Sequence, residues 1–312
     1  MYIGVDIGGT KCAVVKADDS GNIVEKVRFE TKSCSETIDE FIKIIKSMGS
    51  AKAVGISCGG PLDSKKGVIM SPPNLMGWDD VHIVEIFEKK LNIPTFLEND
   101  ANACALAEWK FGAGKGSKNM VFLTFGTGLG AGLILNGSLY RGTSDMAGEA
   151  GHIRLAEFGP VGYGKSGSFE GFCSGGGIAQ LGKLKAMESL QMGRKLSYCD
   201  SLDDIENITA KKIADLAKAG HEDASEIYKI SARKLGMGLS FLIDILNPEK
   251  IVIGSVFERC EALFREEMEK VLKCECLQLS YDCCTVCSAE LGDKIGDYAA
   301  VSVAINGLEN KQ

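Results

Sequence analysis

The fold of this 312-residue chain is decided by two glycine-rich stretches, Val5-Asp6-Ile7-Gly8-Gly9-Thr10-Lys11 and Thr124-Phe125-Gly126-Thr127-Gly128-Leu129-Gly130. Each stretch follows a short apolar run and leads into a second apolar run, which ends at a polar turn. Because the pattern repeats beyond the glycines themselves, it predicts two related half-folds within one chain. Two loops lined by backbone N–H groups would together suit a polyphosphate.

The residue types in the first loop fit an anion-binding role. Glycines at positions 8 and 9 allow the backbone to approach an anion, and Thr10 adds a hydroxyl donor. Asp6, at the end of the preceding strand, could hold Mg²⁺ through its water shell. The alternative is that each loop is only a glycine-rich hairpin turn.

Both glycine loops are followed by a strand. A Rossmann loop leads into a helix, and a Walker A loop requires the pattern G-x4-G-K-[ST], so neither motif fits. A phosphate site between two β-hairpins is the arrangement of the actin-like ATPase (ribonuclease H-like) folds. We therefore predict an α/β chain of this class, with two α/β domains and a central cleft.

Composition narrows the class of protein. A hydrophobic content of 45% and a charged content of 25% are those of a globular protein. The net charge of −7, without any long basic block, argues against nucleic acid as a partner. No apolar run approaches the roughly 18 residues needed to span a membrane, and no secretory signal precedes the first strand. We expect a cytoplasmic protein with no membrane association and with its 12 cysteines reduced.

The pattern of secondary structure suggests where the domains divide. We predict helices that begin near Ser33, Asp79, Asp100 and Ile295, and a helical stretch over 200–246 with Thr209 as an N-cap. We also predict a buried strand over 51–57 and further strands over 94–97, 251–253 and near Thr285. The small polar segment 112–117 is the expected boundary. The predicted small domain comprises residues 1–112 plus 295–312, and the large domain comprises residues 113–294.

The chain resembles the ROK family of sugar kinases and related repressors. The resemblance extends over nearly the whole sequence, in family order, through the segments Asp6 to Lys11, Ser71 to Leu75 with Trp78, Glu98 to Ala103, Phe125 to Gly130, and Gly148 to His152. The third and the last of these segments are the most specific to the family.

The resemblance implies roles for five residues. Asp100 matches the catalytic base, Asn99 matches a sugar ligand, and Glu149, His152 and Glu170 match contacts to sugar hydroxyls. A carboxylate within hydrogen-bond reach can take the proton of a sugar hydroxyl during phosphoryl transfer. The alternatives are helix N-capping for Asn99 and Asp100, and an ordinary surface or packed position for a lone Glu or His.

The resemblance also implies the cofactors ATP and Mg²⁺ and a homodimer. The expected phosphate and nucleotide contacts are Asp6, Gly8, Gly9, Thr10, Lys11, Thr127, Gly128 and Gly254, with Asp6 near Mg²⁺. The expected reaction is phosphorylation of a hexose, in the manner of a glucokinase at the 6-hydroxyl. Substrates such as N-acetylmannosamine (an N-acetylhexosamine), fructose and allose stay open.

Two rival functions belong to other classes. One is a non-catalytic sugar sensor or regulator related to the ROK repressors, which carry a helix-turn-helix before the first phosphate loop. Asp6 leaves no space for such a segment in this sequence. The other is an actin-fold ATPase of the chaperone or cytoskeletal type, which would have no need of a sugar.

The sequence departs from the family pattern at the structural zinc segment. Val161, Tyr163 and Ser168 stand where many members carry three cysteines. Tetrahedral zinc needs about four strong ligands, so we expect no zinc site there. A rival metal site is the cluster Cys274, Cys276, Cys283, Cys284 and Cys287, for which packed or surface thiols are the alternative. Two smaller departures are Cys58, in a turn near the sugar, and Ser255, which replaces a glycine after Gly254.

Overall fold

The computed structural model describes residues 1–311, which divide into two compact units. Unit 1 comprises Met1–Lys118, Gly132–Ala147 and the chain from Glu290 onward, and unit 2 comprises Asn119–Ala131 and Gly148–Ala289. Unit 1 thus contains both segments predicted for the small domain. It also includes residues 113–118, 132–147 and 290–294.

A five-stranded sheet organises unit 1. Its strand order is β3-β2-β1-β4-β7, with bounds Ile23–Glu30, Lys11–Ala17, Tyr2–Ile7, Val54–Cys58 and Thr95–Asn99. Strands β1, β2 and β3 are antiparallel, whereas β1, β4 and β7 run parallel. The carboxyl ends of the three parallel strands therefore meet at one edge, where Ile7 pairs with Cys58 and Cys58 pairs with Asn99.

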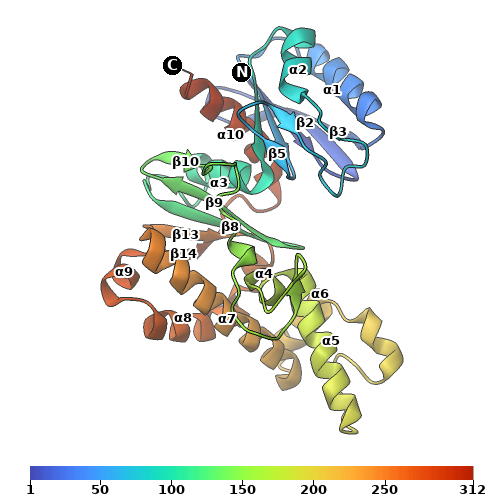
Figure 1. Cartoon of the computed structure of the whole chain (residues 1–312), viewed down its shortest axis with the longest axis vertical. Coiled ribbons are helices and arrows are strands. Elements are labelled where there is room, and N and C mark those ends of the chain that lie inside the picture. The colour runs from blue at the N-terminus through green and yellow to red at the C-terminus, as the bar shows by residue number, and fades with distance from the viewer. Residues whose placement is uncertain (312) are drawn as a thin grey trace. The chain divides into compact units, whose positions relative to one another are not determined.

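Helices cover both faces of this sheet (Figure 1). Helices α1 (Cys34–Met48) and α2 (Ile83–Leu91) bury Phe41 and Phe87 in a core that includes Ile3 and Val5. Helix α10 (Ile295–Glu309) packs on β1 and β4 and also contacts α3 (Asp100–Phe111). Since side chains alternate along a strand, Gly4 faces α10 while its neighbours face the other helices.

Two glycines allow α10 to lie directly on the sheet. A Cβ added at Gly4 would come within 2.8 Å of the Val301 nitrogen, and one at Gly55 within 2.2 Å of the Ala300 oxygen. Both distances are far below a van der Waals contact with backbone. The C-terminal helix therefore requires glycine at these two strand positions.

Unit 1 also contains two hairpins and a short turn. Strands β5 (Leu62–Asp63) and β6 (Val68–Ile69) pair antiparallel. Strand β10 (Ser138–Tyr140) pairs antiparallel with residues 133–135 of β9 (Leu129–Leu135). A 3₁₀ turn, η3 (Gly292–Lys294), precedes α10.

Unit 2 is built on parallel strands. Strand β13 (Lys250–Ile253) pairs parallel with β8 (Met120–Phe125) on one side and with β14 (Thr285–Ser288) on the other. Its helices are α4 (Phe169–Phe172), α5 (Gly175–Gln191), α6 (Ala210–Lys218), α7 (Glu222–Leu246), α8 (Val256–Glu275) and α9 (Gln278–Cys283). Short elements are η1 (Ala150–His152), η2 (Leu202–Asn207), β11 (Val161–Gly162) and β12 (Lys165–Ser166). Phe264 lies at the centre of an aromatic core with Phe125, Tyr228 and Phe257.

Several sequence predictions are confirmed at the level of single elements. The Thr209 hydroxyl accepts a hydrogen bond from the Lys212 N–H and caps α6, and the helices from Asp100 and from Ile295 form as expected. The helix predicted to begin near Ser33 also forms, as α1, although the Ser33 hydroxyl donates to Glu36 and accepts no backbone N–H. Residues 202–207 form η2 rather than α-helix, and α2 begins at Ile83 rather than near Asp79.

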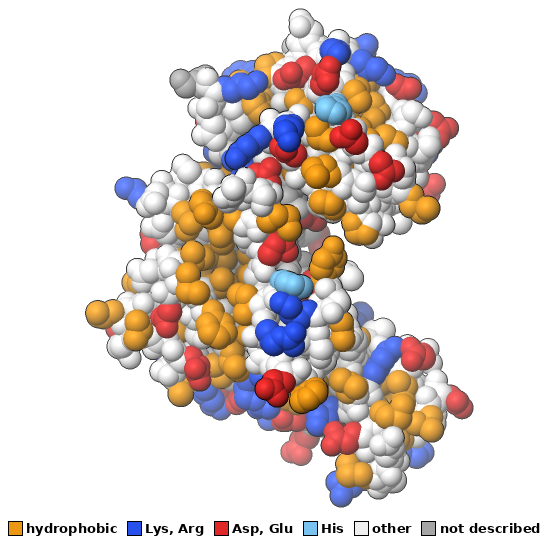
Figure 2. Space-filling model, in the orientation of Figure 1, with side chains coloured by type: hydrophobic (Ala, Val, Ile, Leu, Met, Phe, Trp, Pro, Cys, Tyr) orange, Lys and Arg blue, Asp and Glu red, His pale blue; other side chains and the backbone are white. Residues whose placement is uncertain are grey.

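Within residues 1–311, no helix is long and apolar enough to cross a membrane. On the face drawn in Figure 2, acidic and basic side chains are interspersed.

Candidate functional site

The first glycine loop connects β1 to β2 at the carboxyl edge of the unit 1 sheet. A Cβ at Gly8 would lie 2.6 Å from the Lys11 oxygen, and one at Gly9 would lie 2.5 Å from the Asn74 oxygen. Thr31 fixes the loop from the side, because its hydroxyl donates a 2.6 Å hydrogen bond to the Gly8 oxygen. The glycines are therefore required by close backbone packing, and the loop lies against the segment Ser71 to Leu75 through Asn74.

Asp6 is a largely buried carboxyl next to this loop. Burial, followed by the negative charges of Asp100 and Asp297, raises the pKa of Asp6 to about 6, against the opposing effect of Lys26 and Arg28. A hollow of about 490 Å³ in unit 1 opens beside it and is lined by Asp6, Lys11, Cys12, Ala13, Arg28, Phe29, Glu30, Asp293, Gly296 and Asp297.

The residues Asn99 and Asp100 lie where β7 ends and α3 begins. The Asn99 side-chain oxygen accepts a 2.9 Å hydrogen bond from the Ala101 N–H, so Asn99 does cap the helix, as the alternative interpretation held. The Asp100 carboxylate accepts from the same N–H at 2.8 Å. Capping uses one oxygen of each side chain and leaves the Asn99 amide nitrogen and the second Asp100 oxygen for other contacts.

Asp100 is accessible to solvent although protein atoms crowd around it. This crowding raises the pKa of the carboxyl above its usual value, and the backbone N–H of Ala101 partly offsets the effect. Cys58, on the adjacent strand, is buried, and its thiol pKa is raised by burial and by the nearby Asp100 and Asp6 charges. The thiol therefore stays neutral, and the acid–base groups of this edge are the two carboxyls.

Glu98 fixes the turn that carries Asn99 and Asp100. Its side chain is 1% exposed and forms an ion pair with Arg141, whose Nε lies 2.6 Å from the Glu98 Oε2. The other carboxylate oxygen accepts from the Asn102 amide at 3.0 Å and from the Asn99 N–H at 3.1 Å. A single buried carboxylate thus ties β7, α3 and the segment after β10 together.

The second glycine loop, in unit 2, is bonded to Glu170. The Glu170 Oε2 accepts from the Leu129 N–H at 3.0 Å, and it would lie 2.7 Å from a Cβ at Gly128. Gly151, from η1, also packs on Glu170. A Cβ added at Gly151 would lie 3.3 Å from the Glu170 Cβ. The structure thus brings Thr127-Gly128, η1 and Glu170 together within unit 2.

Glu149 and His152 flank the 3₁₀ turn η1. Glu149 stands at its N-cap position and His152 is its last residue, and both are exposed. The Glu149 carbonyl accepts from the His152 N–H at 3.1 Å, which closes the turn. A carboxylate and an imidazole held by one turn can bond neighbouring hydroxyls of one ligand.

A hairpin replaces the family's zinc segment. Strands β11 and β12 pair across Tyr163 and Gly164, which adopt φ of 42° and 74°. The Gln180 side chain both donates to and accepts from the Val161 backbone, at 2.9 and 3.0 Å. Ser168, in place of a thiolate, caps α4 by accepting from the Gly171 N–H at 3.0 Å. Within residues 1–311, no group of three or more His, Cys, Asp and Glu side chains could hold a metal ion.

Sequence reasoning missed the N-terminus of α5. Ser174 caps this helix by accepting from the Gly177 N–H at 2.9 Å, and the Gly175 N–H donates to the Gly126 oxygen at 2.8 Å. The helix therefore begins against the second glycine loop, where its N–H groups and dipole favour an anion. The signal was present as Ser174-Gly175-Gly176-Gly177, a serine N-cap followed by three glycines.

Gly254 ends β13, and its N–H donates to the Leu123 oxygen at 3.0 Å. Ser255 follows at the N-cap of α8 with φ 57° and ψ −108°, a conformation that favours glycine. Ser255, which replaces the family's second glycine, therefore keeps a backbone conformation that favours glycine.

A family model matches residues 2–306, and its description is the ROK family. The chain belongs to the ROK family. The glucokinase of Streptomyces coelicolor is 32% identical over 313 residues, which cover 97% of each chain. This length of match extends over both units and both glycine loops.

Solved structures agree with this assignment. A ROK hexokinase from Thermus thermophilus aligns with a TM-score of 0.82 at 27% identity over 99% of both chains. A ROK family glucokinase from Streptomyces griseus, solved in complex with glucose and AMPPNP, aligns with a TM-score of 0.76 at 29% identity, over 98% of this chain and 99% of that one. The predicted actin-like ATPase fold is confirmed by these neighbours.

The charge on Asp6 predicts a pH-dependent stability. A carboxyl whose pKa is raised to about 6 on folding stabilises the folded state fully below its unfolded pKa, and this contribution is lost as the pH rises through about 6. Asp6→Asn cannot ionise, so we expect it to be more stable than the wild type at pH 8, by up to about 3 kcal/mol. Thermal unfolding at pH 8 and pH 5 measures the difference, which should narrow at the lower pH.

The control is Asp200→Asn, at an exposed position, which should leave the unfolding temperature unchanged at both pH values. A less stable Asp6→Asn variant at pH 8 would show that the Asp6 charge is stabilised by the fold rather than opposed by it.

Proposed function

We propose that this protein is an ATP-dependent sugar kinase that phosphorylates a hexose. The observation that carries the proposal is the carboxyl edge of unit 1, where the solvent-accessible Asp100 stands beside Asn99, with the Gly8-Gly9 loop on the same edge. A hydroxyl acceptor needs a base, and a phosphoryl donor needs backbone N–H groups, and this edge supplies both. The relatedness to glucokinases supports the same reaction class.

In the proposed mechanism, Asp100 accepts the proton of the attacking sugar hydroxyl. Its raised pKa makes the Asp100 carboxylate a stronger base than an ordinary aspartate, and its exposure to solvent leaves it accessible to a substrate. Asn99 has an amide nitrogen available to bond the sugar, and the Glu98–Arg141 pair keeps both side chains in place. Orientation of this kind supplies much of the rate acceleration in reactions between two bound substrates.

The nucleotide contacts proposed in unit 1 are Asp6, Gly8, Gly9, Thr10 and Lys11. Asp6 fits a hydrated Mg²⁺, because a divalent cation would favour the ionised carboxylate, which burial and the nearby Asp100 and Asp297 charges disfavour. When bound, the cation would supply charge neutralisation for the phosphate oxygens. In unit 2, we propose Thr127, Gly128, Gly254 and the N-terminus of α5 as further nucleotide contacts.

The sugar contacts proposed in unit 2 are Glu149, His152 and Glu170. Glu149 and His152 are exposed on one turn, which supports direct bonds to hydroxyls. Glu170 already accepts from the Leu129 N–H through one oxygen, so we propose that it bonds the sugar through the other and couples the sugar to the second glycine loop. The proposed substrate is glucose at its 6-hydroxyl, since the Streptomyces griseus relative was solved with glucose and AMPPNP.

The first prediction concerns the wild-type protein. ADP release with Mg-ATP should depend on the sugar when a panel of glucose, fructose, allose, N-acetylmannosamine and other hexoses is supplied. Glucose should give the highest kcat/KM, and the product should carry the phosphate on its 6-oxygen by phosphorus NMR. Release without any sugar would indicate an ATPase, and sugar binding without release would indicate a sensor. Either result would contradict the proposal.

The second prediction concerns the base. Asp100→Asn should lower kcat by about a hundred- to ten-thousandfold, because the amide cannot take a proton. Sugar binding measured by calorimetry should change little. The matched control Asp80→Asn, at an exposed position of the same unit, should keep wild-type kcat. Retained turnover in Asp100→Asn would remove Asp100 from the mechanism.

A further inference from the structure

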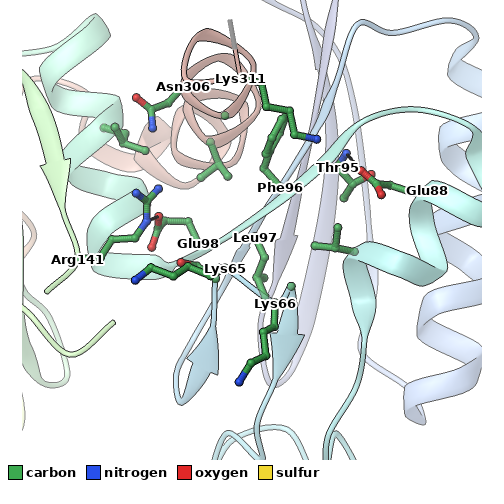
Figure 3. A pocket seen from close by; sticks show the side chains of 16 residues that line it. Lys65, Lys66, Glu88, Thr95, Phe96, Leu97, Glu98, Arg141, Asn306 and Lys311 are labelled. Carbon is green, nitrogen blue, oxygen red and sulfur yellow. Dashed lines mark hydrogen bonds and ion pairs between the residues drawn. The ribbon is translucent and has the colours of Figure 1, made fainter. Parts of the chain in front are cut away.

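A second pocket in unit 1 lies away from the glycine loop. Its volume is about 330 Å³, and it is walled by α2, β7, α10, the β5–β6 turn and the segment after β10 (Figure 3). We propose that this pocket binds a small organic phosphate, a phosphate monoester on a body of a few carbons. The proposal concerns binding and stands apart from the proposed kinase activity.

The first support is the arrangement of Arg141. Its Nε is bonded to the Glu98 carboxylate, and Figure 3 shows the two terminal nitrogens of the guanidinium pointing away from Glu98 toward the side of the pocket where Asn306 lies. A guanidinium held by one edge presents its other N–H groups in a fixed fork, which matches two oxygens of a phosphate. The ion pair therefore orients Arg141 and leaves its two terminal nitrogens available to a ligand.

The second support is Asn306, a largely buried polar side chain on the pocket wall. The residue is 5% exposed and lines the pocket. Figure 3 shows this amide on the α10 side of the pocket, facing Arg141. An amide in this position can donate to a ligand oxygen or accept from a ligand hydroxyl in the pocket.

The third support is an excess of positive charge. Three cationic side chains of the lining, Lys65, Arg141 and Lys311, stand against two acidic ones, Glu88 and Glu98, while a fourth cation, Lys66, is paired with Asp63. Both acids already accept bonds from the protein, Glu88 from the Thr95 N–H at 3.1 Å and Glu98 from Arg141. The surplus charge favours an anion over a cation or a neutral ligand.

The neighbouring residues Lys65 and Lys66 differ in the direction of their side chains and in their ion pairing. Lys66 forms an ion pair with Asp63 at 3.0 Å and its ammonium points away from the pocket in Figure 3. Lys65 extends along the same wall as Glu98 and Arg141 in that view. Lys65 therefore contributes to the proposed anion site, and Lys66 does not.

The floor of the pocket sets the size of the ligand. Leu97, Leu106 and Val303 line it and are at most 4% exposed. A volume of about 330 Å³ exceeds what an inorganic phosphate fills and lies at the lower end for pockets that hold small organic ligands. The phosphate would bond Arg141 and Lys65, and the carbon body would cover the apolar floor.

The pocket shares Glu98 with the turn that holds Asn99 and Asp100. A ligand on Arg141 would bind the ion-pair partner of Glu98, which lies two residues before the proposed base Asp100. Regulation of kinase activity through the Arg141–Glu98 pair rests on the proposed function, whereas ligand binding to the pocket does not.

The test measures binding to the full chain by isothermal titration calorimetry. The probes are glycerol 3-phosphate, inorganic phosphate and malonate, because none of them resembles a hexose product. We expect glycerol 3-phosphate to bind with the highest affinity. Lys65→Gln and Asn306→Leu should each weaken that binding by about five- to tenfold, which corresponds to the loss of one charged or one buried hydrogen bond. Thermal unfolding of each variant checks that it is folded.

The matched control is Lys66→Gln, which changes the net charge equally but should leave the affinity unchanged. Absence of glycerol 3-phosphate binding to the wild type would overturn the proposal, and so would equal weakening by Lys65→Gln and Lys66→Gln. Tighter binding of malonate would assign the pocket to carboxylates instead of phosphate esters and would also overturn it. A wild type that binds the probe but lacks kinase activity would separate this inference from the proposed function.

Discussion

The burial of the Asp6 carboxyl near a second carboxyl, Asp100, is the constraint on which the rest of the site depends. Asp6 is the next-to-last residue of β1, and Asp100 directly follows β7, the strand beyond β4. Because parallel strands end at the same edge, the topology itself brings the two acids together. Burial is the main cause that raises the pKa of Asp6 to about 6, the charges of Asp100 and Asp297 add to it, and Lys26 and Arg28 offset it only in part. A hydrated cation and a bound substrate are the natural means of relieving it.

Close packing makes this edge rigid. Gly4 and Gly55 let α10 lie against the sheet, and Gly9 lets the first loop touch Asn74. Glu98 then joins β7 to Arg141 and to α3 through a buried carboxylate. Truncation of Arg141 would leave Glu98 as an unpaired buried charge, which is costly. The side chains proposed for catalysis are thus held by groups that take no part in the chemistry.

The sequence allowed the glycine loops, the Asn99-Asp100 turn and the fold class to be predicted, because each depends on local residue types. It could not reveal the Glu98–Arg141 pair, whose members lie 43 residues apart and meet only through the sheet and its hairpin. Nor could it show that Glu170 bonds the Leu129 N–H. The hairpin that replaces the zinc segment depends on left-handed Tyr163 and Gly164 and on the distant Gln180, a combination with no sequence signature.

The most direct test of the account is the titration of the Asp6 carboxyl by carbon-13 NMR in the wild type and in Asp100→Asn. We predict a pKa of about 6 in the wild type, and a lower value in the variant because the neighbouring negative charge is gone. An Asp6 pKa close to the ordinary value of 3.8 in the wild type would contradict the account. A raised value that Asp100→Asn leaves unchanged would show that the two carboxyls do not act on each other.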